Sequence, residues 1–252
     1  MPRFKDQAVC IREIDWSETS QVVALLTESH GVVRGLAKGS KRTSAGAVAR
    51  FSGGIEVLTL GQVGRTTRPI SDLAQLTEWD LQDDFHHLRT SFDAQMLGFY
   101  AADITAALVG EGDAHPRVFA ALTGMLAELA EPASRDAALL CYQWRLLTDC
   151  GYQPDLQRDV HEDKPLPDRA TYGFDARAGG FTARRVANGS ATNVFGPWKV
   201  RRETLTILRE VDAAGRVDAT SAVTTRANRL LCVYIRAILD RQLPTMRYVL
   251  GD

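Results

Sequence analysis

Short apolar runs, separated by turn residues, dominate the first third of the chain. Several are rich in β-branched and aliphatic residues, and from residue 54 onwards Ile55, Val57 and Thr59 alternate with side chains that would face the opposite way. Such runs and such alternation are typical of β-strands. The predicted strands are residues 7–14, 21–27, 31–37, 54–63 and 70–79. Five short strands within about 80 residues predict a small Greek-key barrel of the OB type.

From residue 84 onwards the spacing of apolar residues becomes helical. Between Phe85 and Leu108 they recur at steps of three and four, which predicts one amphipathic helix of about six turns. Pro116 is suited to the first turn of a second helix, and Gly151 and Gly215 are suited to left-handed helix ends. The further predicted helices are residues 137–150, 198–211 and 222–239.

Residues 152–196 interrupt this helical pattern. They contain several prolines and glycines and show no helical period. A structureless loop of this length is unusual inside a compact domain, so a small strand-and-turn subdomain is expected. The predicted fold class is α+β, with a five-stranded OB-fold β-barrel in residues 1–80. A mainly α-helical domain follows in residues 81–252, and the irregular subdomain is inserted into it.

The composition is that of a folded globular protein. Of 252 residues, 45% are hydrophobic and 24% are charged, which argues against disorder of the whole chain. No apolar run approaches the length of about 18 residues that a membrane span needs, and the first residues hold no apolar secretion signal. The four cysteines form no CxxC pair. We therefore expect a cytoplasmic protein with reduced cysteines, without membrane contact and without a cofactor.

Charge is distributed unevenly although the totals balance. The chain holds 30 basic and 31 acidic residues, yet the segment from Ser29 to Ser71 holds one acid, Glu56, against seven bases. These bases are Arg34, Lys38, Lys41, Arg42, Arg50, Arg65 and Arg68. A one-signed surface on an OB-like barrel fits a polyanion, and nucleic acid first of all. The residues Trp16, Phe51 and Trp79 are either base-stacking residues or parts of the core.

Other residue groups carry weaker functional signals. The segment 35–41 lacks the Walker spacing of a phosphate loop, and the adjacent His86 and His87 point about 100° apart on a helix. An acidic group in the irregular region fits either a solvated surface or a divalent-cation site: Asp155, Asp159, Glu162, Asp163 and Asp168. A second basic group fits solubility, a further nucleic-acid contact or a clasp for an acidic peptide: Arg226, Arg229, Arg236, Arg241 and Arg247.

Several segments resemble the RecO family of bacterial recombination mediators. In the first half these are residues 8–15 (AVCIREID), 17–19 (SET), 23–31 (VALLTESHG) and 33–42 (VRGLAKGSKR). In the second half they are 144–147 (WRLL), 151–155 (GYQPD), 174–180 (FDARAGG) and the terminal 230–250. The resemblance implies an OB barrel and a helical domain, binding to single- and double-stranded DNA, and annealing of complementary strands. It also implies partnership with RecR, contact with the acidic tail of single-stranded-DNA-binding protein, and indirect help in RecA loading.

One departure from this family concerns a structural zinc. Many members carry two CxxC pairs in the irregular region, and the corresponding positions here are Asp159, Glu162, Ala183 and Val186. Alanine and valine offer no ligand atom, whereas structural zinc sites use four ligands, mostly nitrogen or sulfur. We therefore expect a zinc-free subdomain. It would be held together by the packing of Leu166, Tyr172, Phe174 and Phe181.

Together the residues and the resemblance predict a DNA-binding recombination mediator in DNA repair that is not an enzyme. The expected main phosphate contacts are Arg34, Lys38, Lys41 and Arg42, supported by Arg50, Arg65 and Arg68; a possible second basic surface consists of Arg226, Arg229, Arg236 and Arg241. One alternative is a protein-interaction adaptor that keeps the fold with little DNA affinity. Another is a divalent-metal-dependent enzyme that uses the acidic group at residues 155–168. The expected location is the cytoplasm, in association with the nucleoid.

Overall fold

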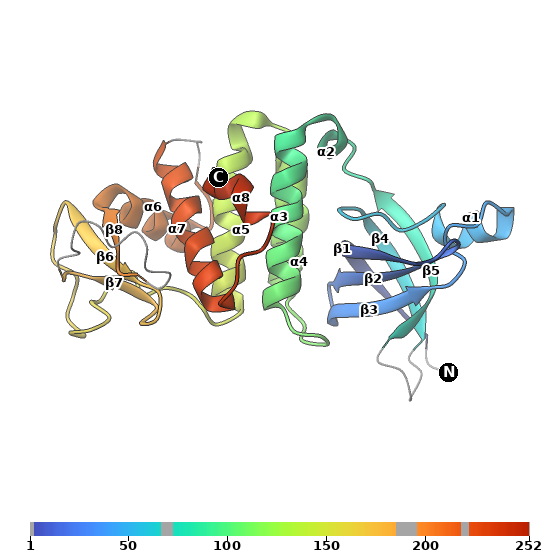
Figure 1. Ribbon diagram of the computed structural model, residues 1–252, viewed down its shortest axis with the longest axis horizontal. Helices are drawn as coiled ribbons and strands as arrows, with labels where there is room; N and C mark the ends of the chain where they lie inside the picture. Colours follow the sequence, from blue (N-terminus) through green and yellow to red (C-terminus); the bar gives the residue numbers. More distant parts are fainter. Residues whose placement is uncertain (1–2, 67–72, 185–195, 218–221, 252) are drawn as a thin grey trace. The chain divides into compact units, whose positions relative to one another are not determined.

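The computed structural model describes residues 3–66, 73–184, 196–217 and 222–251, with side chains from residue 5 onwards. The chain divides into two compact units, Met1–Ala130 and Glu131–Asp252. Figure 1 shows the succession of elements along the chain: strands come first, then helices, then a second small sheet followed by further helices. Within the described residues, no helix combines the length and the apolar character that crossing a membrane requires.

Five strands form a closed barrel in the first unit. They are β1 (Arg3–Ser17), β2 (Ser20–Thr27), β3 (Gly31–Ala37), β4 (Leu60–Thr66) and β5 (Ala74–Asp83). Their order is β1-β2-β3-β5-β4, and β4 pairs with β1 to close the barrel (Figure 1). All neighbours are antiparallel except β3 and β5, which run parallel. The predicted OB-type barrel is thereby confirmed.

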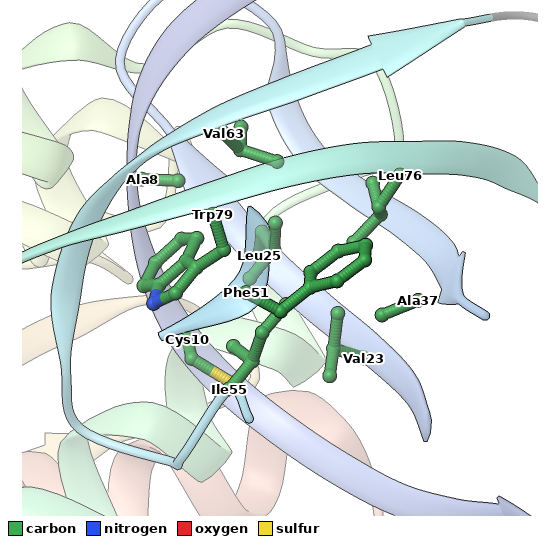
Figure 2. Close-up of a cluster of buried hydrophobic side chains, with 10 residues drawn as sticks. All are labelled: Ala8, Cys10, Val23, Leu25, Ala37, Phe51, Ile55, Val63, Leu76 and Trp79. Atoms are coloured by element: carbon green, nitrogen blue, oxygen red, sulfur yellow. The ribbon is translucent and has the colours of Figure 1, made fainter. Parts of the chain in front are cut away.

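Side chains from every strand and from one helix fill the barrel. Helix α1 (Ala45–Phe51) lies in the connection between β3 and β4, and its last residue, Phe51, is 1% exposed. Figure 2 shows the rings of Phe51 and Trp79 among aliphatic side chains of the strands. The cluster consists of Ala8, Cys10, Val23, Leu25, Ala37, Phe51, Ile55, Val63, Leu76 and Trp79. Burial of a side chain of this size contributes about 2–3 kcal/mol, so Phe51 anchors α1 to the barrel.

The predicted strand at residues 54–63 is wrong in its first half. Residues 54–59 do not belong to a strand, and β4 begins only at Leu60. Leu58 has a φ of +64°, which is incompatible with a regular strand. The segment between the third and fourth predicted strands contains the helix α1 (Ala45–Phe51), which the sequence pattern did not predict.

One buried amide explains why residues 54–59 leave the strand pattern. Gln21 Oε1 accepts a hydrogen bond from Ile55 N at 3.1 Å, and Gln21 Nε2 donates to Ile55 O at 3.0 Å. Ile55 is thereby held in the core, where it is fully buried. Gln21 Oε1 also accepts from Ser40 Oγ at 2.8 Å. The start of the β3–β4 connection and its far end are therefore fastened to the same residue of β2.

Three helices complete the first unit: α2 (His87–Thr90), α3 (Phe92–Leu108) and α4 (Pro116–Glu128). The single long helix predicted from Phe85 to Leu108 is divided at Ser91, which is extended (φ −135°, ψ 114°) and accepts a hydrogen bond from Ala94 N at its Oγ. Serine in this geometry is a favoured helix N-cap, so α3 starts anew after it. Pro116 begins α4, as its position predicts. The predicted division into a barrel domain at residues 1–80 and a helical domain at residues 81–252 stays a prediction.

The second unit combines four helices with a small sheet. The helices are α5 (Arg135–Asp149), α6 (Arg202–Ala214), α7 (Ala222–Leu239) and α8 (Met246–Leu250), and the turn η1 (Pro132–Ser134) precedes them. The antiparallel sheet has the order β7-β6-β8, formed by β6 (Thr171–Asp175), β7 (Gly180–Thr182) and β8 (Trp198–Arg201). The predicted strand-and-turn subdomain in the irregular region is confirmed. The helix predicted at 198–211 is corrected, since its first four residues form β8.

Aromatic rings hold this small sheet together. Phe174 is fully buried, and its ring centre lies 5.1 Å from that of Phe181 and 5.2 Å from that of Tyr234 on α7. Tyr172 is also buried and meets Phe181 edge-on at 6.3 Å. Of the four predicted packing residues, Leu166 is the exception, because it is only half-buried.

Candidate nucleic-acid interface

Three of the seven predicted phosphate contacts line one groove of the first unit. Lys38, Arg42 and Arg50 border a space of about 730 Å³, together with Lys5. We call these four cations and the space between them the basic groove. The acidic residue in the lining of this groove is Glu78, whose Oε1 lies 2.7 Å from Lys5 Nζ. Four positive charges face one negative charge, so the lining is strongly electropositive.

The turn after β3 brings Lys38 and Arg42 to the groove. Gly39 has a φ of +73°, a left-handed conformation that glycine adopts without steric cost. Arg42 N donates to Gly39 O at 3.2 Å, and Gly39 N donates to Ser20 Oγ at 3.1 Å, which fastens the turn to β2. Both Lys38 and Arg42 are exposed and form no ion pair with any residue that the structure describes. Their charges are available to an external anion.

Helix α1 positions Arg50. Its Nε donates to Gly46 O at 3.2 Å, and its guanidinium carbon lies 5.8 Å from the centre of the Phe51 ring. Because Phe51 is buried in the barrel core, the end of α1 that carries Arg50 has a fixed place. The groove therefore has one wall formed by the turn after β3 and another formed by a helix anchored in the core.

Lys5 belongs to the groove although the sequence pattern does not indicate it. The predicted first strand begins at residue 7, whereas β1 begins at Arg3 and pairs there with β4, Lys5 opposite Gly64. This pairing joins segments that are far apart in the sequence. A local pattern cannot reveal it, and the basic character of the first residues is the only signal.

Lys41 faces away from the groove lining. Its Nζ forms ion pairs with Asp15 and, at 3.4 Å, with Glu13, both on β1. The hydrogen bond to Asp15 raises the pKa of Lys41, and the charge of Glu13 adds to that effect. Its positive charge is therefore matched within the protein. A role as a phosphate contact stays a prediction for Lys41, with two carboxylates as internal competitors.

The remaining predicted phosphate contacts are dispersed. Arg34 lies on the outer face of β3, where its Nη1 is 3.3 Å from Glu111 Oε1. Arg65 is half-buried on β4, opposite Leu76 of β5. Arg68 lies outside the described residues. The structure thus brings only part of the basic segment together.

The arginines of the second predicted basic surface differ in their exposure to solvent. On α7, Arg226 and Arg236 are half-buried, and the Nε atom of each is buried without a hydrogen-bond partner in the described part of the chain. Arg229 and Arg241 are exposed. The exposed Arg247 donates to Tyr248 Oη at 2.8 Å, so that member of the group has a local role. A functional role for this surface stays a prediction.

The three candidate stacking residues have different surroundings. Trp79 and Phe51 are each 1% exposed and belong to the barrel core. Trp16, near the end of β1, is 67% exposed. Of the three, Trp16 alone presents its ring to solvent.

The acidic group of the irregular region is engaged in local contacts. Asp155 Oδ1 accepts from Gln157 N at 2.7 Å and from Arg158 N at 2.9 Å. Asp163 Oδ1 lies 2.6 Å from Arg158 Nε, and Asp168 Oδ1 lies 2.6 Å from Arg202 Nη1. Among the residues that the structure describes, no cluster of three or more histidine, cysteine or carboxylate side chains has the geometry to hold a metal ion.

Two family models match consecutive parts of this chain. The model described as "Recombination protein O N terminal" matches residues 1–85, and the model described as "Recombination protein O C terminal" matches residues 89–247. The chain belongs to the recombination protein O (RecO) family. The basic groove lies within the N-terminal match, and the small sheet and α7 lie within the C-terminal match.

Curated RecO proteins align along much of their length. The chain is 27% identical over 254 residues to the DNA repair protein RecO of Anaeromyxobacter dehalogenans strain 2CP-C, covering 99% of this chain and 96% of the relative. It is 26% identical to that of Roseiflexus sp. strain RS-1, covering 94% and 82%. For Dehalococcoides mccartyi strain BAV1 the identity is 26%, covering 73% and 70%.

Asp159, the first of the four positions at which the family resemblance predicts cysteines in other members, is only 3% exposed. Its Oδ1 accepts from His161 N at 2.9 Å and Glu162 N at 3.2 Å, and its Oδ2 accepts from Thr182 Oγ1 at 3.0 Å and Ala183 N at 2.6 Å. Burial acts to raise the pKa of Asp159, but these hydrogen bonds outweigh it and lower the pKa. The Asp159 carboxylate thereby joins the turn at His161 and Glu162 to the end of β7 at Thr182 and Ala183.

Proposed function

We propose that this RecO-family chain is a DNA-binding recombination mediator without enzymatic activity. The observation that carries the proposal is the basic groove on the OB barrel, where Lys38 and Arg42 lack internal ion pairs among the described residues. Cations of this kind bind phosphates and release the counterions condensed on DNA. OB folds bind oligonucleotides with the neighbouring strand faces and loops. Single- and double-stranded DNA both carry phosphates, so a groove that contacts phosphates can bind either form.

Membership of the RecO family supports the finer parts of the proposed role. Annealing requires that two strands be held close with their charges neutralised and their bases accessible, and the groove meets the charge requirement. The proposed partners are RecR and the acidic tail of single-stranded-DNA-binding protein, with RecA loaded as the consequence. The exposed Arg229 and Arg241 offer positive charge for an acidic tail or for a second strand.

Two alternatives remain distinguishable by experiment. A protein-interaction adaptor would keep the barrel and bind no DNA. A divalent-metal-dependent enzyme would use the acidic group at residues 155–168, but the described contacts of Asp155, Asp159 and Asp163 are with local backbone amides and arginine. Those contacts favour a structural role for the acids.

The salt dependence of DNA binding tests the proposal. For four to six phosphate contacts, the logarithm of single-strand affinity should fall against log salt with a slope of about −3 to −4, since each contact adds about −0.7. Anisotropy titrations with a single strand and with a duplex, each at several salt concentrations, measure this slope. Flat or absent binding at low salt would contradict the proposal and favour the adaptor alternative. Turnover that requires Mg²⁺ or Mn²⁺ would contradict the non-enzymatic role.

A further inference from the structure

Lys5 and Glu78 stand in one cross-strand row with a glycine between them. Lys5 of β1 is paired with Gly64 of β4, and Gly64 is paired in turn with Glu78 of β5. Neighbouring strands lie about 4.8 Å apart, so the backbones of the two charged residues are separated by about 9–10 Å. Their charged atoms, Glu78 Oε1 and Lys5 Nζ, are nevertheless only 2.7 Å apart. The two side chains therefore reach towards each other across β4.

The missing side chain of Gly64 makes this contact possible. A Cβ atom at residue 64 would lie 2.5 Å from Glu78 Cγ and 2.8 Å from Glu78 Oε1. Atoms that are not bonded to each other do not approach so closely, so any other residue at position 64 would displace the glutamate. Glycine inside a strand often marks a place where another group approaches the backbone closely. Here that group is the Glu78 side chain.

The ion pair of Lys5 and Glu78 is accessible and is not needed to hold the strands together. The backbone ladders of β1 with β4 and of β4 with β5 already join the three strands. The side chain of Lys5 is 63% exposed and that of Glu78 is 41% exposed. Exposed ion pairs contribute little to stability, so an external anion can separate this one.

The basic groove contains both members of the pair. Of its four cations, Lys5 alone has an ion pair within the described residues; Lys38, Arg42 and Arg50 have none. Glu78 is therefore directed at a single cation of the groove. In the protein without DNA, its carboxylate holds the place beside Lys5 that a phosphate oxygen would take.

We propose that Glu78 is an internal competitor of bound DNA for Lys5. A phosphate must displace this carboxylate before Lys5 can become the fourth cationic contact of the groove. The inference rests on the proposed function, because the competition is with DNA phosphates. It implies that the groove binds DNA less tightly than its four cations would allow. A limited affinity makes a bound strand easier to release, which suits a protein that passes strands on.

Glu78→Gln tests the competition, because it keeps the size of the side chain and removes its charge. Affinity for a single strand and for a duplex should rise about 3- to 10-fold at low salt, since Lys5 is then free to contact a phosphate. The plot of log affinity for the single strand against log salt should become steeper by up to about 0.7, the value of one added contact. Anisotropy titrations measure both quantities.

Two comparisons separate competition for Lys5 from a general effect of charge. Glu56→Gln makes the same change of net charge at an exposed acid that pairs with Arg89 outside the groove, and it should raise affinity less. An equal gain would overturn the inference. Lys5→Met should abolish the gain when it is combined with Glu78→Gln. A gain that persists in that double variant would show that Glu78 does not act through Lys5.

Gly64→Ala provides a test that leaves every charge in place. The added methyl group should push the Glu78 carboxylate away from Lys5 and so raise DNA affinity, whereas in the Glu78→Gln background it should have no effect. An equal change in both backgrounds would contradict the role given to Gly64. Urea unfolding checks that each variant is folded. If neither wild-type protein nor Glu78→Gln binds DNA at low salt, the proposed function itself has failed.

Discussion

The turn and helix at residues 38–51 and the loop at residues 155–168 are both rich in charge and both adjoin a β-sheet, yet their charges have different partners. Lys38 and Arg42 have no ion pair in the described structure. By contrast, Asp159 accepts four hydrogen bonds and Asp155 accepts two from backbone amides. Charge density alone does not indicate a binding surface. Charged side chains with few partners inside the protein can bind an external ligand, whereas those with many internal partners stabilise the fold.

The difference also explains why the two regions would respond differently to substitution. Removing an exposed cation without a partner leaves the fold unchanged and weakens only an external contact. Removing a buried carboxylate leaves several donors unsatisfied, which costs about 1–3 kcal/mol for each group without a replacement partner. The following predictions test this contrast.

The largest effect is expected for charge reversal in the groove. Lys38→Glu, Arg42→Glu and Arg50→Glu combined should weaken binding of single strand and duplex on the order of 100-fold at low salt, because three phosphate contacts become repulsive. The unfolding free energy should stay within error of wild type. Anisotropy and urea unfolding measure the two quantities. Arg42→Glu alone is compared with Arg247→Glu on α8, which changes the net charge equally, and an equal loss in these two single variants would show that binding is not specific to the groove.

Asp159→Asn should destabilise the protein by about 2 kcal/mol. Asparagine keeps the shape but loses the charge and one acceptor oxygen, so donors from His161, Thr182 or Ala183 lose their partner. Urea unfolding measures the change, and amide exchange near residues 161–162 and 183 locates it. Asp163→Asn, an exposed carboxylate paired with Arg158, serves as the control and should have little effect. DNA affinity should not change in either variant.

Stability should depend on Asp159 at acid pH. The pKa of Asp159 is lower in the folded protein than in the unfolded chain, so the unfolded state binds the proton more readily. Its contribution is complete above the ordinary aspartate pKa of about 3.9. It is lost as the pH falls through the lower folded pKa. Unfolding free energies of wild type and Asp159→Asn should therefore converge below pH of about 3.9, and a constant gap would contradict the assigned pKa direction.

The smallest effect is expected for removal of the Lys41 charge. Lys41→Met should change stability by less than about 1 kcal/mol, since partly exposed ion pairs contribute little. It should weaken single-strand binding about 2- to 5-fold, because Glu13 and Asp15 then lose the cation that neutralises them and their charge reduces the positive potential at the turn that carries Arg42. Adding Glu13→Gln and Asp15→Asn should restore the affinity. If the triple variant stays weak, Lys41 contacts phosphate directly and belongs with the groove cations.

The local parts of the fold were predictable from the sequence. Strands β1, β2 and β3 form two consecutive hairpins, and α7 has an apolar face of regular period, so short-range patterns are sufficient to find them. Ile55 misleads because its alternation with Val57 and Thr59 suits a strand, whereas the amide of Gln21, far away in the sequence, holds it in the core. The break before α3 depends on the Ser91 side chain as an N-cap, which competes with a continuous helical pattern.

For the candidate site, sequence identifies the cations but not their partners. Residues Lys38, Arg42 and Arg50 are within one basic segment, and the turn and α1 bring them together. Lys41 adjoins Arg42 in the sequence, yet its contacts with Glu13 and Asp15 arise from the packing of the turn on the β1–β2 hairpin. Lys5 joins the groove through the pairing of β1 with β4. These contacts depend on the pairing and packing of segments that are distant in the sequence, which a local sequence pattern does not reveal.

Gln21 has a consequence for the modularity of the barrel. Its amide holds Ser40 at one end of the β3–β4 connection and Ile55 at the other. The stretch between these two residues carries Arg42 and Arg50; hydrogen bonds to Gln21 hold its two ends, and Phe51 anchors it in the barrel core. We expect that a stretch from another barrel could replace it and change the ligand preference while the five strands keep their register, if an aromatic residue fills the place of Phe51 in the core.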